Sequence, residues 1–438
     1  MQYDYIIEQK PNRRGGGDLK EMKEVVLRQK AEREEMIGKR YIPRDALQNA
    51  RSHMNDSLIK VISGPRRAGK SVFAIQLLEG INFGYLNFDD EQLIGAKDYD
   101  ILVKAVREVY GETKFLLFDE IQNLPKWELF INRLHRRGFT VVITGSNSQL
   151  LSRELATHLT GRHTQFQILP FSFREFLRAR EFIVDETITL KEKQGVLLNH
   201  LNEYMNSGGY PEIVIKGMEP KSYLGTLFES ILFRDVVKRY NLRYAKKLHD
   251  LGLYLITNHS NEFSYTRLKN ILSFRSVHTI ENYMEYLQEA FVVFVNERFS
   301  YKIKEQMKSP RKVYAYDTGT INAVKVKITP DIGKLMENVV AVELLRRGKE
   351  FYYYKTRDGK EVDFAVKEGV NINQLLQVCY EVGDDKTGKR ETNALIKSAA
   401  EVGCNNLTVL TWDYEAKEPS GKRTIAYLPL WKWLIGQG

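Results

Sequence analysis

Five short apolar runs between Leu58 and Leu169 alternate with amphipathic stretches that have helical spacing. This alternation constrains the fold strongly, because parallel strands need helical crossovers that cover both faces of their sheet. The runs predict strands at residues 58–63, 83–88, 115–119, 140–144 and 165–169, and the stretches predict helices such as 71–78 and 101–110. We therefore expect an α/β fold built on a parallel sheet.

A glycine-rich segment follows the first predicted strand directly. It matches G-x-x-x-x-G-K-[ST] and opens the first predicted helix, which is the context that a phosphate-binding loop (P-loop) requires. Its backbone N–H groups can wrap around phosphate oxygens, while Lys70 neutralises the β- and γ-phosphates and the Ser71 hydroxyl holds Mg²⁺. The sequence thus predicts a site for ATP and Mg²⁺ made of consecutive residues: Gly64, Pro65, Arg66, Arg67, Ala68, Gly69, Lys70, Ser71 and Val72.

Two acids end the third predicted strand. Asp119 and Glu120 follow the apolar residues 115–118, so a buried strand would deliver both carboxylates to the carboxyl edge of the sheet. Asp119 is expected to bind the magnesium ion, and Glu120 is expected to act as the base that orients the attacking water. A helix-capping role is the alternative for Asp119.

Polar residues also follow the fourth predicted strand, in the run Gly145-Ser146-Asn147-Ser148. An amide or hydroxyl there could sense the γ-phosphate and position water, since ligands gather beyond the carboxyl ends of parallel strands. Asn147 is the first choice and Ser146 the second. An ordinary polar turn accounts for both residues nearly as well.

These motifs occur in an order that resembles the archaeal and bacterial AAA+-type ATPases described as archaeal-ATPase-like. The likeness spans roughly residues 40–180 and includes Gly161-Arg162 and the run from Leu169 to Phe176. It implies a P-loop core of the additional-strand, catalytic-glutamate type, in which strand 140–144 lies between the two phosphate-binding strands. It also implies that Arg162 is a sensor or an arginine finger; Arg153 is its rival, and a solvated surface role is the alternative for each.

Shifts in composition and pattern divide the chain into four expected regions. Residues 1–40 form a flexible and helical extension, 41–180 the ATPase core, 181–325 a helical region and 326–438 a small α/β domain. The helix expected within residues 20–40 has only a weak apolar face, which predicts that it is exposed.

The helical region contains a pattern that resembles a winged helix-turn-helix. Residues 263–268 lead to a capped helix at 276–287, which is followed by the apolar run 291–295. In such a fold the capped helix faces a DNA groove and nearby arginines face phosphates. The DNA-binding candidates are Arg267, Arg275, Ser276, His278, Thr279 and Asn282. The alternative is a module that packs only against protein.

The last region resembles the PD-(D/E)XK nuclease core, in which carboxylates and a lysine bind Mg²⁺ and activate water. Glu337 and Glu343 lie on one predicted helix, Asp363 on a strand and Gln377 on the next strand. The resemblance implies that these four residues are a nuclease-like remnant. The motif demands an acid and a lysine where this chain has Gln377 and Cys379, so we expect a restriction-endonuclease-like fold that binds without cutting.

Charge and composition bear on partners and location. The 66 Lys and Arg residues against 56 Asp and Glu residues give a formal charge of +10, which suits an acidic partner such as DNA. Two cysteines without ligand spacing, and no apolar stretch of membrane length, predict a cytoplasmic protein with no membrane partner. An oligomer is compatible with the sequence, although nothing in it requires a ring.

The leading functional hypothesis is an ATPase that couples nucleotide turnover to binding of, or action on, DNA. The alternative is a nucleotide-gated switch that recruits a protein partner. A small-molecule P-loop kinase is a weaker third option, because the adjacent acids Asp119 and Glu120 are present and a substrate-lid motif is not evident.

Overall fold

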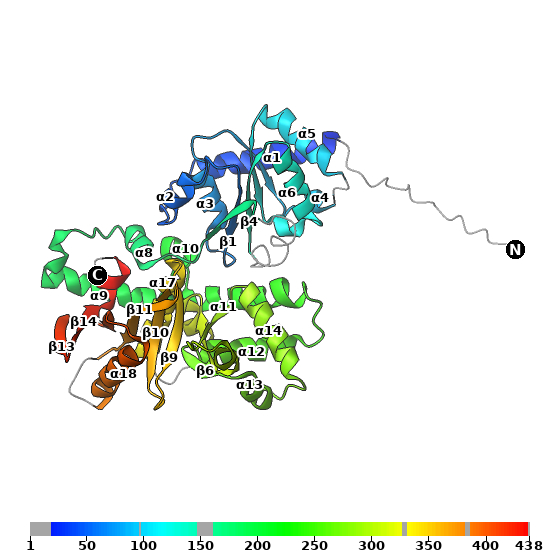
Figure 1. Cartoon of the computed structure of the whole chain (residues 1–438). Coiled ribbons are helices and arrows are strands. Elements are labelled where there is room, and N and C mark those ends of the chain that lie inside the picture. Colours follow the sequence, from blue (N-terminus) through cyan, green and yellow to red (C-terminus); the bar gives the residue numbers. More distant parts are fainter. Residues whose placement is uncertain (1–18, 96–97, 147–160, 326–330, 382–385, 437–438) are drawn as a thin grey trace.

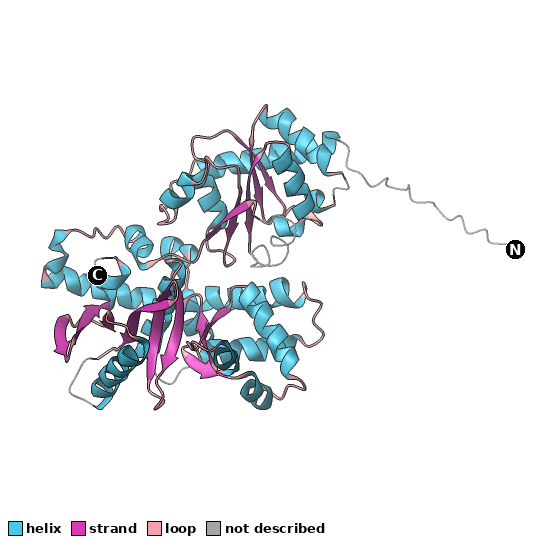
Figure 2. Cartoon of the chain, in the orientation of Figure 1, coloured by secondary structure: helices cyan, strands magenta, loops and turns pink. Residues whose placement is uncertain are grey.

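The computed structural model describes residues 19–95, 98–146, 161–325, 331–381 and 386–436, which form an upper part (residues 19–168) and a lower body (residues 169–436) (Figure 1). In the upper part, helices flank both faces of one central sheet (Figure 2). This is the layered arrangement that the alternation of apolar runs predicted.

The upper sheet has five strands in the order β2-β3-β4-β1-β5, and every neighbouring pair is parallel. Because β4 lies between β1 and β3, the additional-strand arrangement is confirmed. The predicted strands are found at all five places, although the last one begins and ends two residues earlier than expected. The strands are β1 (Ile59–Ser63), β2 (Phe83–Asn87), β3 (Phe115–Asp119), β4 (Thr140–Gly145) and β5 (His163–Gln167).

Helix α1 (Leu19–Ile37) packs on this sheet domain, so the prediction of an exposed helix is wrong. Met22, Val25 and Val26 are buried against the core that includes β2. The Gln29 side chain donates to the Asn87 carbonyl at 3.1 Å and accepts from the Asn87 N–H at 2.9 Å. The apolar residues are few, but their spacing of three and four residues places them all on one face.

The other helices of the upper part cover the two faces of the sheet. They are α2 (Leu47–Ser52), α3 (Lys70–Leu77), α4 (Glu91–Ile94), α5 (Tyr99–Tyr110) and α6 (Trp127–Arg136), with a short 3-10 turn η1 (Ile121–Asn123) after β3.

The lower body begins with helices, as predicted. They are α8 (Phe173–Ala179), α9 (Lys191–Ser207), α10 (Pro211–Lys216), α11 (Pro220–Ser230), the π-helix η4 (Ile231–Val237) and α12 (Ala245–Thr257), with a 3-10 turn η3 (Glu186–Thr189). A small antiparallel sheet in the order β6-β8-β7 follows, with helices around it. Its elements are β6 (Asn261–Phe263), α13 (Tyr265–Ile271), α14 (Val277–Glu289), β7 (Val293–Glu297), α15 (Ile303–Lys308), β8 (Arg311–Ala315) and α16 (Thr318–Val324).

The chain ends in a six-stranded mixed sheet in the order β13-β14-β12-β11-β10-β9. Strands β9, β10 and β11 are antiparallel neighbours, whereas β11 and β12 run parallel. One apolar core joins this sheet to the helices that precede it. The elements are α17 (Ile332–Arg346), β9 (Glu350–Lys355), β10 (Glu361–Glu368), β11 (Asn371–Val378), α18 (Lys386–Val402), β12 (Leu407–Thr411), β13 (Ala416–Ser420), β14 (Arg423–Pro429) and α19 (Leu430–Leu434).

No helix in the described part of the chain combines the length and the apolar character needed to cross a membrane.

Candidate functional site

The glycine-rich loop joins β1 to α3, and backbone geometry explains its glycines. Gly64 has φ 148°, and a Cβ there would lie 2.0 Å from the Ile168 carbonyl oxygen. Gly69 has φ 92° and caps the first turn of α3. Only glycine accepts both conformations without strain. Lys70 follows at once, and its buried ammonium donates to the Pro65 carbonyl at 3.1 Å. The loop therefore has the strand-to-helix geometry that cradles phosphates.

Asp119 ends β3 and is held by three hydroxyl groups. Ser71 Oγ donates to its Oδ1 at 2.9 Å, Thr144 Oγ1 donates to the same oxygen, and Tyr85 OH donates to Oδ2 at 3.3 Å. Burial and the neighbouring charge of Glu120 raise the pKa of Asp119. The structure thus brings together Ser71 and Asp119, the two predicted magnesium ligands, and their oxygens suit Mg²⁺, which takes oxygen ligands together with phosphate.

Glu120 directly follows β3 in the left-handed region, with φ 50°. Its N–H donates to Thr144 Oγ1 at 3.1 Å, and its carboxylate accepts from Gln122 Nε2 at 2.5 Å and lies 3.7 Å from Lys70 Nζ. Burial opposes ionisation, but the Lys70 charge and the Gln122 hydrogen bond prevail and lower the pKa of Glu120. An ionised carboxylate at this place can accept a proton from water.

Thr144, Gln122 and Tyr85 were not predicted as site residues. Thr144 connects both acids, because its hydroxyl donates to Asp119 and accepts from the Glu120 N–H. In the sequence Thr144 is only a polar residue at the end of an apolar strand, which is not a distinctive signal. Gln122 Nε2 also lies 3.5 Å from Ser146 Oγ. Ser146 therefore lies near Glu120, whereas Asn147 lies outside the described residues.

Arg162 does not reach this site within its own chain, and its role as a sensor or an arginine finger stays a prediction. Its carbonyl accepts from the Ile59 N–H at 2.9 Å, at the amino end of β1, and its guanidinium donates to Asn132 Oδ1. The P-loop follows the other end of β1, so strand length alone separates the two places by about 13 Å. Arg153, its rival, lies outside the described residues.

Two arginines of the loop, at positions that the motif leaves unspecified, contact the lower body. This body faces the carboxyl edge of the upper sheet (Figure 1). Arg66 Nη1 lies 3.2 Å from Asp235 Oδ1 on η4, and Arg67 Nη1 lies 3.7 Å from Glu212 Oε1 on α10. Arg44, which is buried beneath the loop, donates to the Ala68 carbonyl at 2.8 Å. The P-loop therefore takes part in the contact between the two parts, at the place where phosphates are expected to bind.

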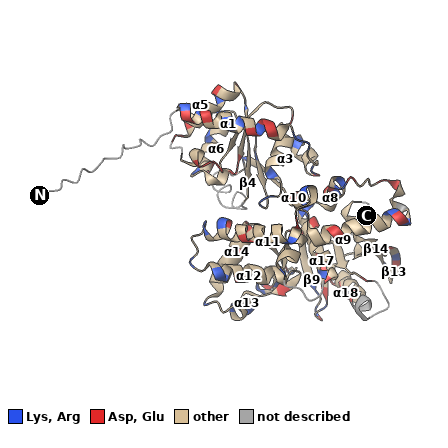
Figure 3. Cartoon of the chain, turned by 180° about the vertical axis from the view of Figure 1, so that it is seen from behind, with Lys and Arg blue, Asp and Glu red and all other residues tan. Residues whose placement is uncertain are grey.

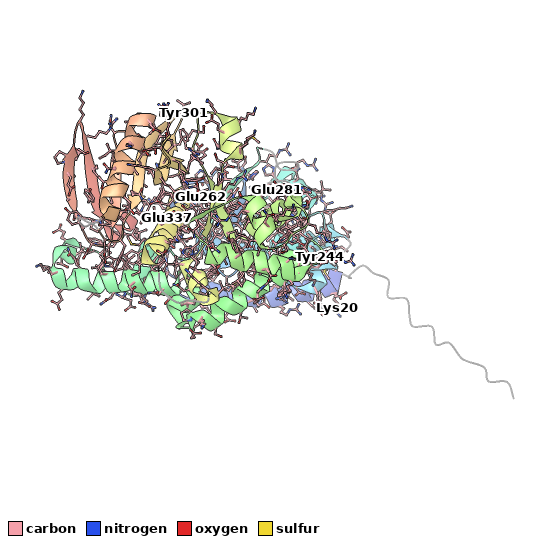
Figure 4. All side chains as sticks on the ribbon, turned by 90° about the horizontal axis from the view of Figure 1, so that it is seen from below. Lys20, Tyr244, Glu262, Glu281, Tyr301 and Glu337 are labelled. Carbon is pink, nitrogen blue, oxygen red and sulfur yellow. The ribbon has the colours of Figure 1, made fainter. Side chains whose placement is uncertain are left out.

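A second cluster of ionisable groups lies in the lower body, where Glu337 of α17, Asp363 of β10 and Gln377 of β11 line one cavity of about 700 Å³. Figure 4 places Glu337 among the elements of this body. The prediction that these three residues come together is confirmed. Glu343 is not part of the cluster, because its carboxylate binds Arg346 and Arg347 on another face of α17.

Lys312 of β8 inserts into this cluster, which no pattern in the sequence predicted. Its side chain is 2% exposed, and its Nζ lies 2.7 Å from Glu337, 2.7 Å from Glu361 and 3.3 Å from Asp363. Burial opposes its charge, but the carboxylates raise the pKa of Lys312 well above its usual value. Burial also raises the pKa of Glu337 to about 8. An ammonium ion thus occupies the centre of the acids, and the described residues contain no group of three or more acids, histidines or cysteines arranged for a metal.

The predicted DNA-contacting residues lie around the start of α14. Arg267, Arg275, Ser276 and His278 are exposed, whereas Thr279 and Asn282 are half-buried. Ser276 caps the helix by accepting from the His278 N–H at 3.1 Å. The exposed face of α14 continues with Glu281 and Glu285. Basic and acidic residues are interspersed over the lower body (Figure 3).

Comparisons with known proteins divide the chain into three segments. Residues 56–177 match an AAA domain, residues 198–331 match a domain of unknown function (DUF8612), and residues 332–432 match another domain of unknown function (DUF4143). Among solved structures, the Walker-type ATPase PABY2304 of Pyrococcus abyssi is similar, with a TM-score of 0.44 and 13% identity over 66% of this chain and 100% of that chain.

Curated relatives extend the likeness to nearly the whole chain. The uncharacterized protein MJ1544 of Methanocaldococcus jannaschii is 37% identical over 397 residues, which cover 86% of this chain and 88% of the relative. An uncharacterized protein of Haemophilus influenzae is 32% identical over 357 residues, which cover 77% and 86%. The chain therefore belongs to the family of AAA-domain proteins that includes MJ1544, and its amino-terminal part is an archaeal AAA-type P-loop ATPase domain.

Proposed function

We propose that this protein binds and hydrolyses ATP with Mg²⁺ and couples the turnover to binding of, or action on, DNA. The observation that carries the ATPase part is the meeting of Lys70, Ser71, Asp119 and Glu120 at the carboxyl edge of the sheet. Each of these residue types has a role in the transfer of a phosphoryl group to water. The four side chains already lie close together, so no rearrangement of the fold is needed to form the site.

The side chains of the site have different roles in the proposed reaction. Lys70 and the loop N–H groups hold the phosphates, and Ser71 with Asp119 would hold the metal. Mg²⁺ supplies charge that neutralises the phosphoryl oxygens when it is bound. Glu120 accepts the proton of the attacking water, and Gln122 and Thr144 fix its carboxylate and backbone.

The order of elements in the lower body supports the DNA part. Helix α12, strand β6, helices α13 and α14, and strands β7 and β8 follow each other as in a winged helix-turn-helix, and the sheet order β6-β8-β7 agrees with that fold. The positive net charge favours an acidic partner. A cytoplasmic location is part of the proposal, supported by Cys379 and Cys404, which are both buried thiols outside any disulfide of the described residues.

The last domain is proposed to keep a restriction-endonuclease-like fold without cutting. Its order α17-β9-β10-β11-α18-β12, with antiparallel and then parallel pairing, supports that fold. An amide stands at Gln377 in place of an acid, and Lys312 satisfies the remaining carboxylates. A DNA cleavage assay with Mg²⁺, using Asp363→Ala as control, tests this proposal. Cleavage by the wild type and not by the Asp363→Ala variant would contradict it.

Two substitutions test the ATPase site. Lys70→Ala is expected to abolish ATP binding, whereas Glu120→Gln is expected to keep binding and to lower turnover at least a hundredfold, since it removes the general base. Nucleotide fluorescence titration and phosphate release measure the two effects. Full turnover in Glu120→Gln would remove the assignment of the base.

A nucleotide-gated switch that recruits a protein partner is the second candidate, and the contact of the P-loop with Asp235 and Glu212 favours it. ATPase rates separate the two candidates. A severalfold rise in rate with DNA, with binding that weakens steeply in salt, supports the DNA-coupled enzyme, whereas turnover indifferent to DNA supports the switch.

A further inference from the structure

A basic groove lies beside the loop that joins β7 to β8. Residues 298–310 of this loop, which include α15, form one side, and β9 with the turn after it contributes the other. The groove encloses about 920 Å³, and we call it the wing groove. Its cationic lining residues are Arg298, Lys302, Lys304, Lys308, Lys355 and Arg357, against the acids Glu305 and Glu401.

The two acids of the wing groove are already engaged. Glu305 accepts from Lys302 at 3.0 Å and from Ser300 at 3.1 Å. Glu401 accepts from Tyr354 OH at 2.6 Å and from the Arg357 N–H at 3.3 Å.

The cations divide into paired and free groups. Lys355 is bound by Glu262 at 2.6 Å and by Glu361 at 3.3 Å. Among the described residues, no carboxylate pairs with the side chains of Lys304, Lys308 or Arg357. These three charges remain available to an anion from outside the chain.

The same loop exposes apolar side chains beside its cations. Tyr301 is 67% exposed, Ile303 74% and Met307 70%. Helix α15 buries none of its residues, so packing within the chain does not explain them. The Tyr301 ring meets Phe299 at its edge, with ring centroids 4.9 Å apart and planes at 78°. An exposed aromatic ring among unpaired cations is the combination with which proteins bind single strands, through base stacking and phosphate contacts.

Helix α14 is a poorer surface for phosphates. Its exposed face carries Glu281 and Glu285, and His278 at its start lies 3.8 Å from Glu281. The negative charges of these glutamates repel the phosphates of the DNA backbone at short range. Figure 4 shows Tyr301 well apart from Glu281, so the two surfaces can be tested separately.

We propose that the wing groove, rather than the face of α14, binds single-stranded DNA, with Tyr301 stacking on a base and Lys304, Lys308 and Arg357 contacting phosphates. The inference rests on the proposed DNA-binding function and gives it a place and a preferred form of DNA.

The test uses the full chain and a fluorescein-labelled mixed-sequence 20-nucleotide strand, with fluorescence anisotropy over a range of salt. Lys304→Glu/Lys308→Glu is expected to weaken binding at least tenfold and to reduce the slope of log K against log salt by about 1.4, the loss of two phosphate contacts. Tyr301→Ala is expected to weaken binding at least fivefold with the slope unchanged. Lys417→Glu/Lys422→Glu, in the distant β13–β14 hairpin, is the matched charge control and should leave affinity within twofold.

Outcomes separate the inference from the function on which it rests. Tighter binding of the duplex, lost in Arg275→Glu and kept in the wing-groove variants, would overturn the inference and leave DNA binding intact. A wild type that hydrolyses ATP and binds neither strand nor duplex would overturn both the inference and the DNA part of the proposed function.

Discussion

Replacing Lys312 by Met tests whether its ammonium stands in for a metal ion in the cavity lined by Glu337, Asp363 and Gln377. Met keeps the apolar stem and removes the charge that lies within 3.3 Å of Glu337, Glu361 and Asp363. Glu361 keeps Lys355 at 3.3 Å, but Glu337 and Asp363 lose their only ion pair among the described residues. The substitution therefore leaves two buried carboxyl groups uncompensated.

The expected loss in the free energy of unfolding follows from these two unpaired carboxyl groups. Breaking a buried ion pair by removing one partner costs about 3–5 kcal/mol. Glu337, with a pKa near 8, can stay neutral by keeping its proton, so the lower end applies and about 3 kcal/mol is expected at pH 7. For a body of this size that corresponds to a fall in melting temperature of roughly 6–10 °C.

Differential scanning fluorimetry with and without 1 mM Mn²⁺ measures both the cost and its cause. Lys312→Met should lose stability and regain part of it with Mn²⁺, because the vacated acids then accept a cation, whereas the wild type should not respond. Lys367→Met is the control, since Lys367 on the same sheet pairs with Glu350 at the surface and its loss should change the melting temperature little. If Mn²⁺ stabilises the wild type and Glu337→Gln removes that effect, a metal binds with Lys312 in place and the reasoning is refuted.

Three further predictions concern the contact between the two parts and the packing of the lower body. Asp235→Asn removes a carboxylate beside the phosphate site and is expected to tighten ATP binding about fivefold in a fluorescence titration, and unchanged affinity would contradict this electrostatic reading. Burial raises the pKa of Asp317 to about 6. The folded state therefore holds the Asp317 proton more tightly than the unfolded state does. The contribution of this proton to the free energy of unfolding is lost as pH rises from about 4 to 6. Asp317→Asn should therefore gain stability relative to wild type over that interval and show a constant difference above it, which melting curves from pH 4 to 8 will test. Gly209→Ala would place a Cβ 2.4 Å from the Phe171 carbonyl oxygen and should cost about 2 kcal/mol, whereas Gly217→Ala, with open space around it, should cost about 1 kcal/mol or less; equal melting temperatures would refute the steric argument.

Local patterns predicted the upper sheet and most of its site. Strand 115–119, the P-loop and the two acids after β3 follow from apolar runs and from the rule that parallel strands end at one edge. Helix α1 was misjudged because its face is narrow, and Thr144 was missed because a single threonine at a strand end carries no distinctive signal. The role predicted for Arg162 came from the family resemblance, which did not take into account that a residue just before β5 lies at the amino edge of the parallel sheet.

Contacts that join distant segments escaped prediction for a different reason. Lys312 reaches Asp363 across 51 residues of sequence, and Arg66 reaches Asp235 across 169. Both pairs depend on how whole elements pack, and the sequence encodes that packing only through the shared core of the lower body. The absence of a lysine at position 379 could therefore be noticed from sequence, but the insertion of Lys312 from β8 among the acids could not.

The π-helix η4 connects the P-loop to helices α12 and α14. Asp235 lies on η4, and η4 packs on α12 and α14. A π-helical turn holds one residue more than an α-helical turn, as the Lys238 N–H to Phe233 carbonyl bond at 3.0 Å shows. Returning that residue to an α-helix would rotate Asp235 by about 100° relative to the segment before it and break its pair with Arg66. Loss of the Arg66 ion pair would in turn remove one contact that holds the π-turn. Through Asp235, the P-loop is thus joined to η4, the element that packs on α12 and α14.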